Sequence, residues 1–152
     1  MATTVWLDLE QTVISIWHDP VLINVEKIKA WLDNRGIKTI NIFSFAVWNQ
    51  ADRDQFNAGM RDMIEQALGR RIDAVPTCEE IKRAVFDSKG TVFDLSEFIS
   101  IWQKEKAFHD YIRLTQGPGE FILIDDSVED VLIFRDNTHQ KICTFNVDRL
   151  ET

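Results

Sequence analysis

The order of hydrophobic and polar positions along the chain predicts short strands that alternate with longer helices. Compact apolar runs rich in Val, Ile and Phe predict strands, and apolar residues that recur every three or four positions predict helices. The predicted strands are residues 5–7, 37–45, 72–77 and 121–127. The predicted helices are residues 25–36, 51–71, 79–86 and 96–116. Two β-rich runs around a polar turn at residues 136–140 then favour a C-terminal β-hairpin over a helix followed by a strand.

Polar and glycine residues at the helix ends agree with these boundaries. Asn24 and Ser96 are suited to cap helix starts, because their short side chains accept hydrogen bonds from free backbone N–H groups. Gly36 is suited to end the first helix, and the glycines and proline of residues 117–119 break the last one.

The alternation of strands and helices predicts an α/β fold of three layers, with a mainly parallel sheet and helices on both faces. At 152 residues the chain fits a single domain, with room for a small helical insertion at about residues 79–95. Right-handed crossovers bring the carboxyl ends of parallel strands to one edge of the sheet, where open α/β folds bind ligands. Asp8, Ser44 and Asp125 stand at such ends, so we expect their side chains to line one site.

Four short motifs occur in order along this framework. They are DLEQT at residues 8–12, IFS at residues 42–44, a lysine within QKEKAF, and LIDDS at residues 123–127. Together they resemble the haloacid dehalogenase-like (HAD) hydrolase superfamily. Its pattern is a strand ending in D-x-D-x-T, a second ending in Ser or Thr, a helical Lys, and a strand ending in two acids. The resemblance spans residues 5–127 and implies a Rossmann-like HAD fold with phosphatase activity.

The resemblance also implies a role for each motif residue. Asp8 is the nucleophile that attacks phosphorus and carries an aspartyl-phosphate. Glu10 occupies the position of the general acid/base, and the Thr12 hydroxyl braces the loop. Ser44 donates a hydrogen bond to the phosphoryl oxygens, and Lys104 offsets their charge.

The choice of lysine depends on its spacing. Lys104 is preferred over Lys106 because it precedes Phe108 by four residues, near the spacing at which family members place the lysine before an aromatic helix position.

A Mg²⁺ site follows from the same resemblance, with Asp125, Asp126, Asp8 and the backbone carbonyl of Glu10 as ligands. The physical logic agrees, because a carboxylate that attacks a phosphoryl group meets like-charge repulsion. Such chemistry needs a hard divalent cation and a positive side chain nearby. We therefore expect bound metal to stabilise the fold as well as to support the reaction.

One position departs from the family pattern, since Glu10 stands where phosphatases of the family have Asp. Its extra methylene moves the carboxylate by about 1.5 Å, and misplacements of this scale cost around a hundredfold in rate. Two alternatives to a phosphatase therefore stay open. One is a catalytically weakened HAD-like binding or regulatory protein, and the other is a phosphotransferase.

Composition narrows the expected partners and location. The formal net charge of −8 disfavours strong non-specific binding to nucleic acid. The expected partner is a phosphorylated small molecule or a macromolecular phosphate end, with a protein partner as a further option. No apolar run nears the roughly 20 residues of a membrane helix and no signal-peptide pattern occurs, so we expect no membrane association and a cytoplasmic location. Cys78 and Cys143 are expected to be reduced core residues.

Overall fold

A six-stranded sheet forms the centre of the computed structural model, which describes residues 2–85, 104–128, 132–135 and 139–151. Five neighbouring strands run parallel in the order β3-β2-β1-β4-β6, and β5 pairs antiparallel with β6 at one edge. The strands are β1 (Thr3–Leu7), β2 (Thr39–Ile42), β3 (Arg71–Ile72), β4 (Gly119–Asp125), β5 (Leu132–Arg135) and β6 (Gln140–Asn146). This is a Rossmann-like α/β sheet with its first strand at the centre.

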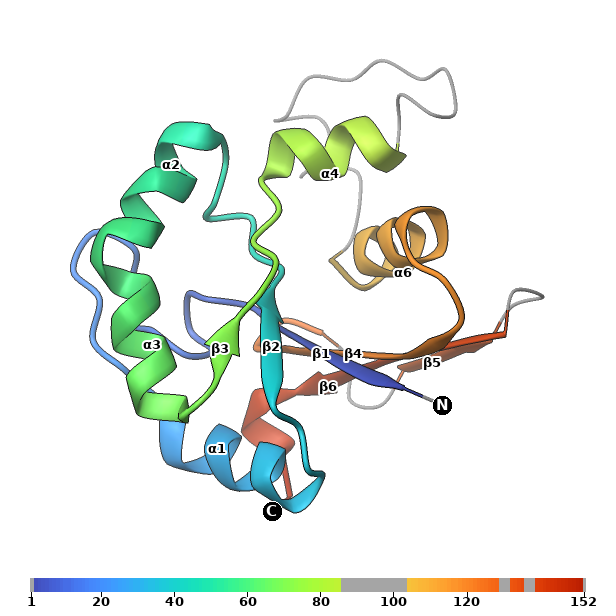
Figure 1. The fold of residues 1–152 in the computed structure, drawn as a ribbon, viewed down its shortest axis with the longest axis horizontal. Coiled ribbons are helices and arrows are strands. Elements are labelled where there is room, and N and C mark those ends of the chain that lie inside the picture. The colour runs from blue at the N-terminus through green and yellow to red at the C-terminus, as the bar shows by residue number, and fades with distance from the viewer. Residues whose placement is uncertain (1, 86–103, 129–131, 136–138, 152) are drawn as a thin grey trace.

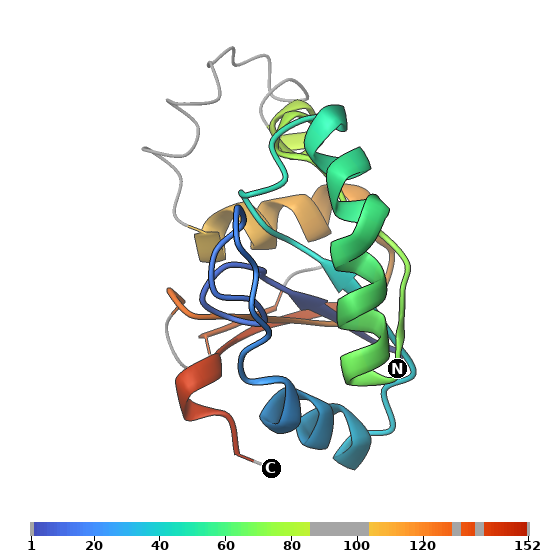
Figure 2. The same ribbon diagram turned by 90° about the vertical axis from the view of Figure 1, so that its left-hand side faces the viewer.

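Helices cover both faces of the sheet, as Figures 1 and 2 show. The helical segments of the described residues are α1 (Val25–Asn34), α2 (Gln50–Gln55), a π-helical turn (Phe56–Met60), α3 (Arg61–Leu68), α4 (Cys78–Val85), α6 (Lys104–Thr115) and a 3-10 turn (Val147–Arg149). Residues of α1, the π-helical turn and α3 share one apolar cluster, and residues of α4 and α6 share another. Successive side chains of β1 point to opposite faces of the sheet. Val5 and Leu7 therefore belong to the first cluster and Trp6 to the second.

The predicted α/β architecture, parallel sheet and C-terminal hairpin are confirmed. The third strand is shorter than predicted, since only Arg71 and Ile72 of the region 71–77 form it. Backbone pairing with β2 continues to Asp73, whose N–H donates to the Ile40 carbonyl at 2.9 Å. The regular ladder then stops because the Ile42 N–H donates to the Ala74 carbonyl, one residue beyond the regular partner, and the Ala74 N–H donates to the Asn41 side-chain oxygen at 2.9 Å.

The helix predictions need two corrections. Asn24 precedes α1, but it adopts a left-handed conformation and its side chain makes no capping bond. Its amide instead donates to the Thr12 carbonyl at 2.9 Å. The helix predicted over residues 51–71 contains the π-helical turn between α2 and α3. Ser96 and the start of the last predicted helix lie outside the described residues, as does the predicted insertion beyond Val85.

Two smaller predictions can also be compared with the structure. Cys78 and Cys143 are both free and buried. Among the helices of the described ranges, none has the length and apolar character needed to cross a membrane.

The buried side chain of Gln140 closes the end of α6. Its amide nitrogen lies 2.9 Å from the Gln116 carbonyl, 3.0 Å from that of Gly117 and 3.3 Å from that of Ile112. These carbonyls belong to the last turn of α6 and the turn beyond it, where the helix begins to run out of its own donors, although the Gln116 N–H still donates to the Ile112 carbonyl at 2.9 Å. We expect Gln140→Leu to lower the free energy of unfolding by about 1 kcal/mol, because the carbonyls of Gln116 and Gly117 lose the hydrogen bonds from the buried amide.

Urea denaturation measures this loss, with Gln116→Ala as the control in the same turn. The exposed Gln116 side chain should matter by less than about 0.5 kcal/mol. An equal loss in both variants would contradict the capping role of Gln140.

Candidate functional site

The parallel register places the ends of three strands side by side at one edge of the sheet. Leu7 of β1 pairs with the last residue of β2 on one side and with Ile124 of β4 on the other. The Asp8 N–H continues the ladder by donating to the Ile124 carbonyl at 3.0 Å. Asp8, Ser44 and Asp125 therefore stand at the carboxyl ends of neighbouring strands, where the strand pattern of the sequence puts them.

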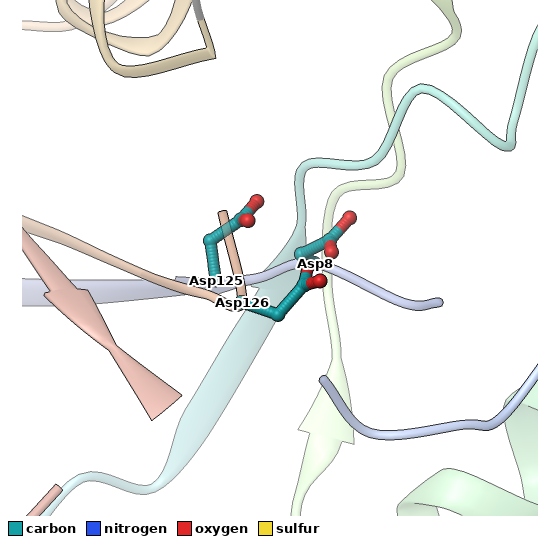
Figure 3. A group of neighbouring side chains, drawn as sticks. All are labelled: Asp8, Asp125 and Asp126. Carbon is teal, nitrogen blue, oxygen red and sulfur yellow. The ribbon is translucent and has the colours of Figure 1, made fainter. Parts of the chain in front are cut away.

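Three carboxylates gather at this edge. Asp8 follows β1, Asp125 ends β4, and Asp126 comes next in the chain; Figure 3 shows the Asp126 side chain turned toward Asp8. One oxygen from each lies within 4.8 Å of the others. Asp125 is fully buried and Asp8 is 6% exposed, so two of the three charges are shielded from water.

Lys104 supplies the positive charge beside these carboxylates. Its ammonium lies 2.8 Å from Asp8 Oδ1 and 2.8 Å from Asp125 Oδ2, and its side chain is only 11% exposed. Lys104 is the first residue of α6, so the helix start carries it over the strand ends. Lys106, the alternative weighed from the sequence, is exposed.

Hydroxyl groups hold the other oxygens of the buried carboxylates. The Thr12 hydroxyl donates to Asp8 Oδ2 at 3.1 Å and lies 3.5 Å from Asp126 Oδ1. The Ser127 N–H and hydroxyl both donate to Asp125 Oδ1 at 2.8 Å. Asp8 and Asp125 are thus fixed through both of their oxygens before any ligand binds.

Burial and mutual repulsion shift the pKa values of the acids in different directions. Burial, together with the Asp125 charge, raises the pKa of Asp8 in spite of Lys104. Burial would also raise the pKa of Asp125, but the Lys104 ammonium and the Ser127 donors bring it below its usual value. The pKa of Asp126 rises to about 6 through burial and the neighbouring Asp125 and Asp8 charges.

Burial and the neighbouring carboxylates also act on the pKa of Lys104, and they act in opposite directions. Burial alone would lower the pKa of Lys104, but the Asp8 and Asp125 carboxylates raise it above its usual value. The ammonium therefore stays charged, and one positive charge faces three acids.

The donor set fits a small, hard cation. Mg²⁺ and Ca²⁺ prefer carboxylate oxygens, and two ligands of one Mg²⁺ lie at most about 4.2 Å apart, twice the metal–oxygen distance. One carboxylate oxygen each of Asp8, Asp125 and Asp126 lies within 4.8 Å of the others, which is close to this spread. Small side-chain rotations would bring them around one ion, whose charge would offset their repulsion.

Glu10 and Ser44 make other contacts. The Glu10 carboxylate lies outside the group of three acids and accepts a hydrogen bond from the Trp17 N–H at 2.9 Å. The Ser44 hydroxyl oxygen, at the end of β2, accepts a hydrogen bond from the Ala46 N–H at 3.2 Å. Ser44 is buried beside β1, whereas the Glu10 side chain is directed to the segment that follows the first motif.

Two residues at the site were not predicted. Ser127 fixes Asp125, and the Asn146 amide donates to the carbonyls of Asp126 and Val128 at 3.2 and 3.1 Å. Asn146 is the register partner of Asp125 in β6. The sequence carried a signal for Ser127, which directly follows the two acids of LIDDS, but the pairing that brings Asn146 there depends on the strand order.

A small hairpin after the first motif was also not predicted. Ile14 pairs antiparallel with Leu22, and the Ser15 N–H donates to the Val21 carbonyl at 2.8 Å. We call residues 14–22 the hairpin. Its signal was present as β-branched residues on either side of a turn-forming Asp-Pro pair at residues 19–20.

No family model, no curated protein and no solved structure matches this chain.

Proposed function

We propose that this protein is a Mg²⁺-dependent, HAD-type phosphatase that hydrolyses a phosphomonoester through an aspartyl-phosphate on Asp8. The observation that supports it most is the position of Lys104, whose ammonium lies 2.8 Å from both Asp8 and Asp125. A carboxylate that attacks a phosphoryl group needs a fixed positive charge where negative charge accumulates. A buried ammonium between two carboxylates at the strand ends meets that need.

The proposed reaction has two steps. In the first, an oxygen of Asp8 forms a bond to phosphorus while the bond from phosphorus to the ester oxygen breaks, and the released oxygen takes up a proton. In the second, water attacks the aspartyl-phosphate, which releases phosphate and restores the carboxylate. Lys104 and Thr12 hold Asp8 in place for the attack, and orientation of this kind is a large share of such catalysis.

The remaining site residues bind and balance charge in this proposal. Asp8, Asp125 and Asp126 would hold Mg²⁺, with the backbone carbonyl of Glu10 as a further ligand in the family pattern. The bound cation would offset the negative charge of the phosphoryl group. The Ser44 hydroxyl, at the neighbouring strand end, is the candidate hydrogen-bond donor to the phosphoryl oxygens.

Hydrolysis of p-nitrophenyl phosphate tests the proposal. We expect turnover with Mg²⁺ that is abolished by EDTA and restored by excess Mg²⁺, because the carboxylates repel the substrate when no cation is bound. Beryllium fluoride, which mimics a phosphoryl group on a carboxylate, should raise the melting temperature only when Mg²⁺ is also present. The proposal would be contradicted if the protein showed no hydrolysis and if beryllium fluoride caused no Mg²⁺-dependent shift of the melting temperature.

One observation favours a second candidate, a HAD-like binding or regulatory protein with weak catalysis. The Glu10 carboxylate is already hydrogen-bonded to the backbone of Trp17, so the residue at the proton-donor position has another contact. A protein of this kind would show Mg²⁺-dependent stabilisation without turnover. A phosphotransferase uses the same residues and would be recognised by a phosphorylated acceptor in place of free phosphate.

A further inference from the structure

The hydrogen bond between Glu10 and Trp17 connects the nucleophile motif to the hairpin of residues 14–22. Glu10 Oε2 accepts from the Trp17 N–H at 2.9 Å, across seven positions of the chain. Trp17 lies in the middle of the hairpin, is only 7% exposed and belongs to the apolar cluster that contains Val5 and Leu7 of β1. A charged acceptor makes this bond stronger than one between neutral groups.

Hydrogen bonds from Gln11 and within the hairpin itself hold the base of the hairpin in place. Gln11, with a positive φ of 62°, donates through its backbone N–H to the Ile14 carbonyl at 2.7 Å and through its side chain to the Ser15 carbonyl at 2.8 Å. The Ser15 hydroxyl oxygen accepts from the Val21 N–H at 3.0 Å and closes the hairpin from inside. Glu10 is the member of this set whose charge reaches the centre of the hairpin.

We infer that Glu10 is a positioning residue that fastens the hairpin beside the reaction site, and that it does not serve as the proton donor. The inference explains the departure from the family pattern. Aspartate at this position is shorter by one carbon–carbon bond, about 1.5 Å, and its carboxylate would end too far from the Trp17 N–H for a hydrogen bond. The extra methylene of Glu10 is thus what allows the contact, and the released ester oxygen takes its proton from water.

This role has a consequence for Asp8, because the fastened segment is continuous with the loop that holds the nucleophile. Thr12, two positions after Glu10, donates to Asp8 Oδ2, and its carbonyl accepts from the Asn24 amide beyond the hairpin. Releasing the hairpin at Trp17 should therefore loosen the loop that orients Asp8. The catalytic part of the inference rests on the proposed phosphatase function, whereas the structural part does not.

Two substitutions at Glu10 separate positioning from proton donation. Glu10→Gln keeps the length and the acceptor oxygen but cannot transfer a proton as an acid. Glu10→Asp keeps the acid, but its side chain is too short to accept the hydrogen bond from the Trp17 N–H. We expect hydrogen exchange at the Trp17 amide to quicken about tenfold to a hundredfold in Glu10→Asp and much less in Glu10→Gln. We also expect kcat/KM to fall further in Glu10→Asp than in Glu10→Gln.

Ser15→Ala is the matched variant, because it loosens the hairpin without changing any acid. It should quicken exchange at Trp17 and lower kcat/KM in the same direction as Glu10→Asp. A comparison of p-nitrophenyl phosphate with an alkyl phosphate completes the test. Loss of a proton donor slows the poor alkyl leaving group selectively, by about 10²–10⁴-fold, whereas loss of positioning slows both substrates alike.

The inference is overturned if Glu10→Gln loses alkyl phosphate hydrolysis selectively while its Trp17 amide stays protected. It is also overturned if Glu10→Asp leaves exchange at Trp17 unchanged. A wild-type protein that hydrolyses neither substrate, but shows the expected exchange pattern, would contradict the proposed function and support the fastening role of Glu10.

Discussion

Asp8→Asn should reduce Mg²⁺-dependent phosphate hydrolysis by at least about 10⁴-fold, the scale seen when a nucleophile is removed. Asparagine has nearly the same shape and can still accept the Thr12 hydrogen bond, but its amide cannot form the aspartyl-phosphate. The fold should survive, because the pKa of Asp8 is raised and its charge is therefore disfavoured in the folded protein. We expect the free energy of unfolding of the metal-free variant to be no lower than that of the metal-free wild type.

Steady-state kinetics and trapping of the intermediate measure this effect. An acyl phosphate is cleaved by hydroxylamine. Wild-type protein that is denatured during turnover and washed free of substrate should therefore release phosphate on hydroxylamine treatment, and Asp8→Asn should not. Asp62→Asn is the control, since it makes the same chemical change at an exposed position of α3. Retained turnover in Asp8→Asn would show that another group attacks the phosphorus.

Lys104→Met should lower the free energy of unfolding of the metal-free protein by about 3–5 kcal/mol, as expected when one partner of a buried ion pair is removed. Asp8 and Asp125 would then face each other without a cation, and both are largely shielded from water. Saturating Mg²⁺ should recover much of the loss, because the metal replaces the missing positive charge.

Urea denaturation with and without Mg²⁺ checks this expectation. Lys106→Met is the matched control on the same helix, and its exposed side chain should change stability by less than about 0.5 kcal/mol. If Lys104→Met does not fold without metal, the double variant Lys104→Met with Asp125→Asn should fold better, since it removes one of the repelling charges. Equal losses in the two lysine variants, or no recovery with Mg²⁺, would contradict the charge balance described for the site.

Strand ends could be predicted from the sequence because their signal is local. A continuous apolar run closed by acids marks both β1 and β4, and parallel pairing then brings Asp8 next to Asp125. The same reasoning placed Ser44 at the end of β2. Lys104 was chosen by its spacing from Phe108, and the structure places its ammonium between the two carboxylates.

The π-helical turn and the contacts of Asn24 and Glu10 could not be predicted, because they depend on hydrogen bonds that do not change the spacing of apolar residues in the sequence. The π-helical turn of residues 56–60 changes which carbonyl each N–H reaches, but the apolar positions on either side still repeat at helical spacing. Asn24 has the composition of a cap, yet its amide donates to a distant carbonyl instead. Glu10 was interpreted by its position in a motif, whereas its partner Trp17 is set by the hairpin, which was not predicted.

The central place of β1 in the sheet also bears on how the protein is made. β1 leaves the ribosome before β4, which lies against its full length and follows more than 110 residues later. At about 5–20 residues per second, one edge of β1 waits on the order of 6–20 s for its partner. During that interval the apolar edge is open to pairing with other chains. The acidic site therefore forms only after β4 has been made, and nascent chains that stop before β4 should depend most on chaperones.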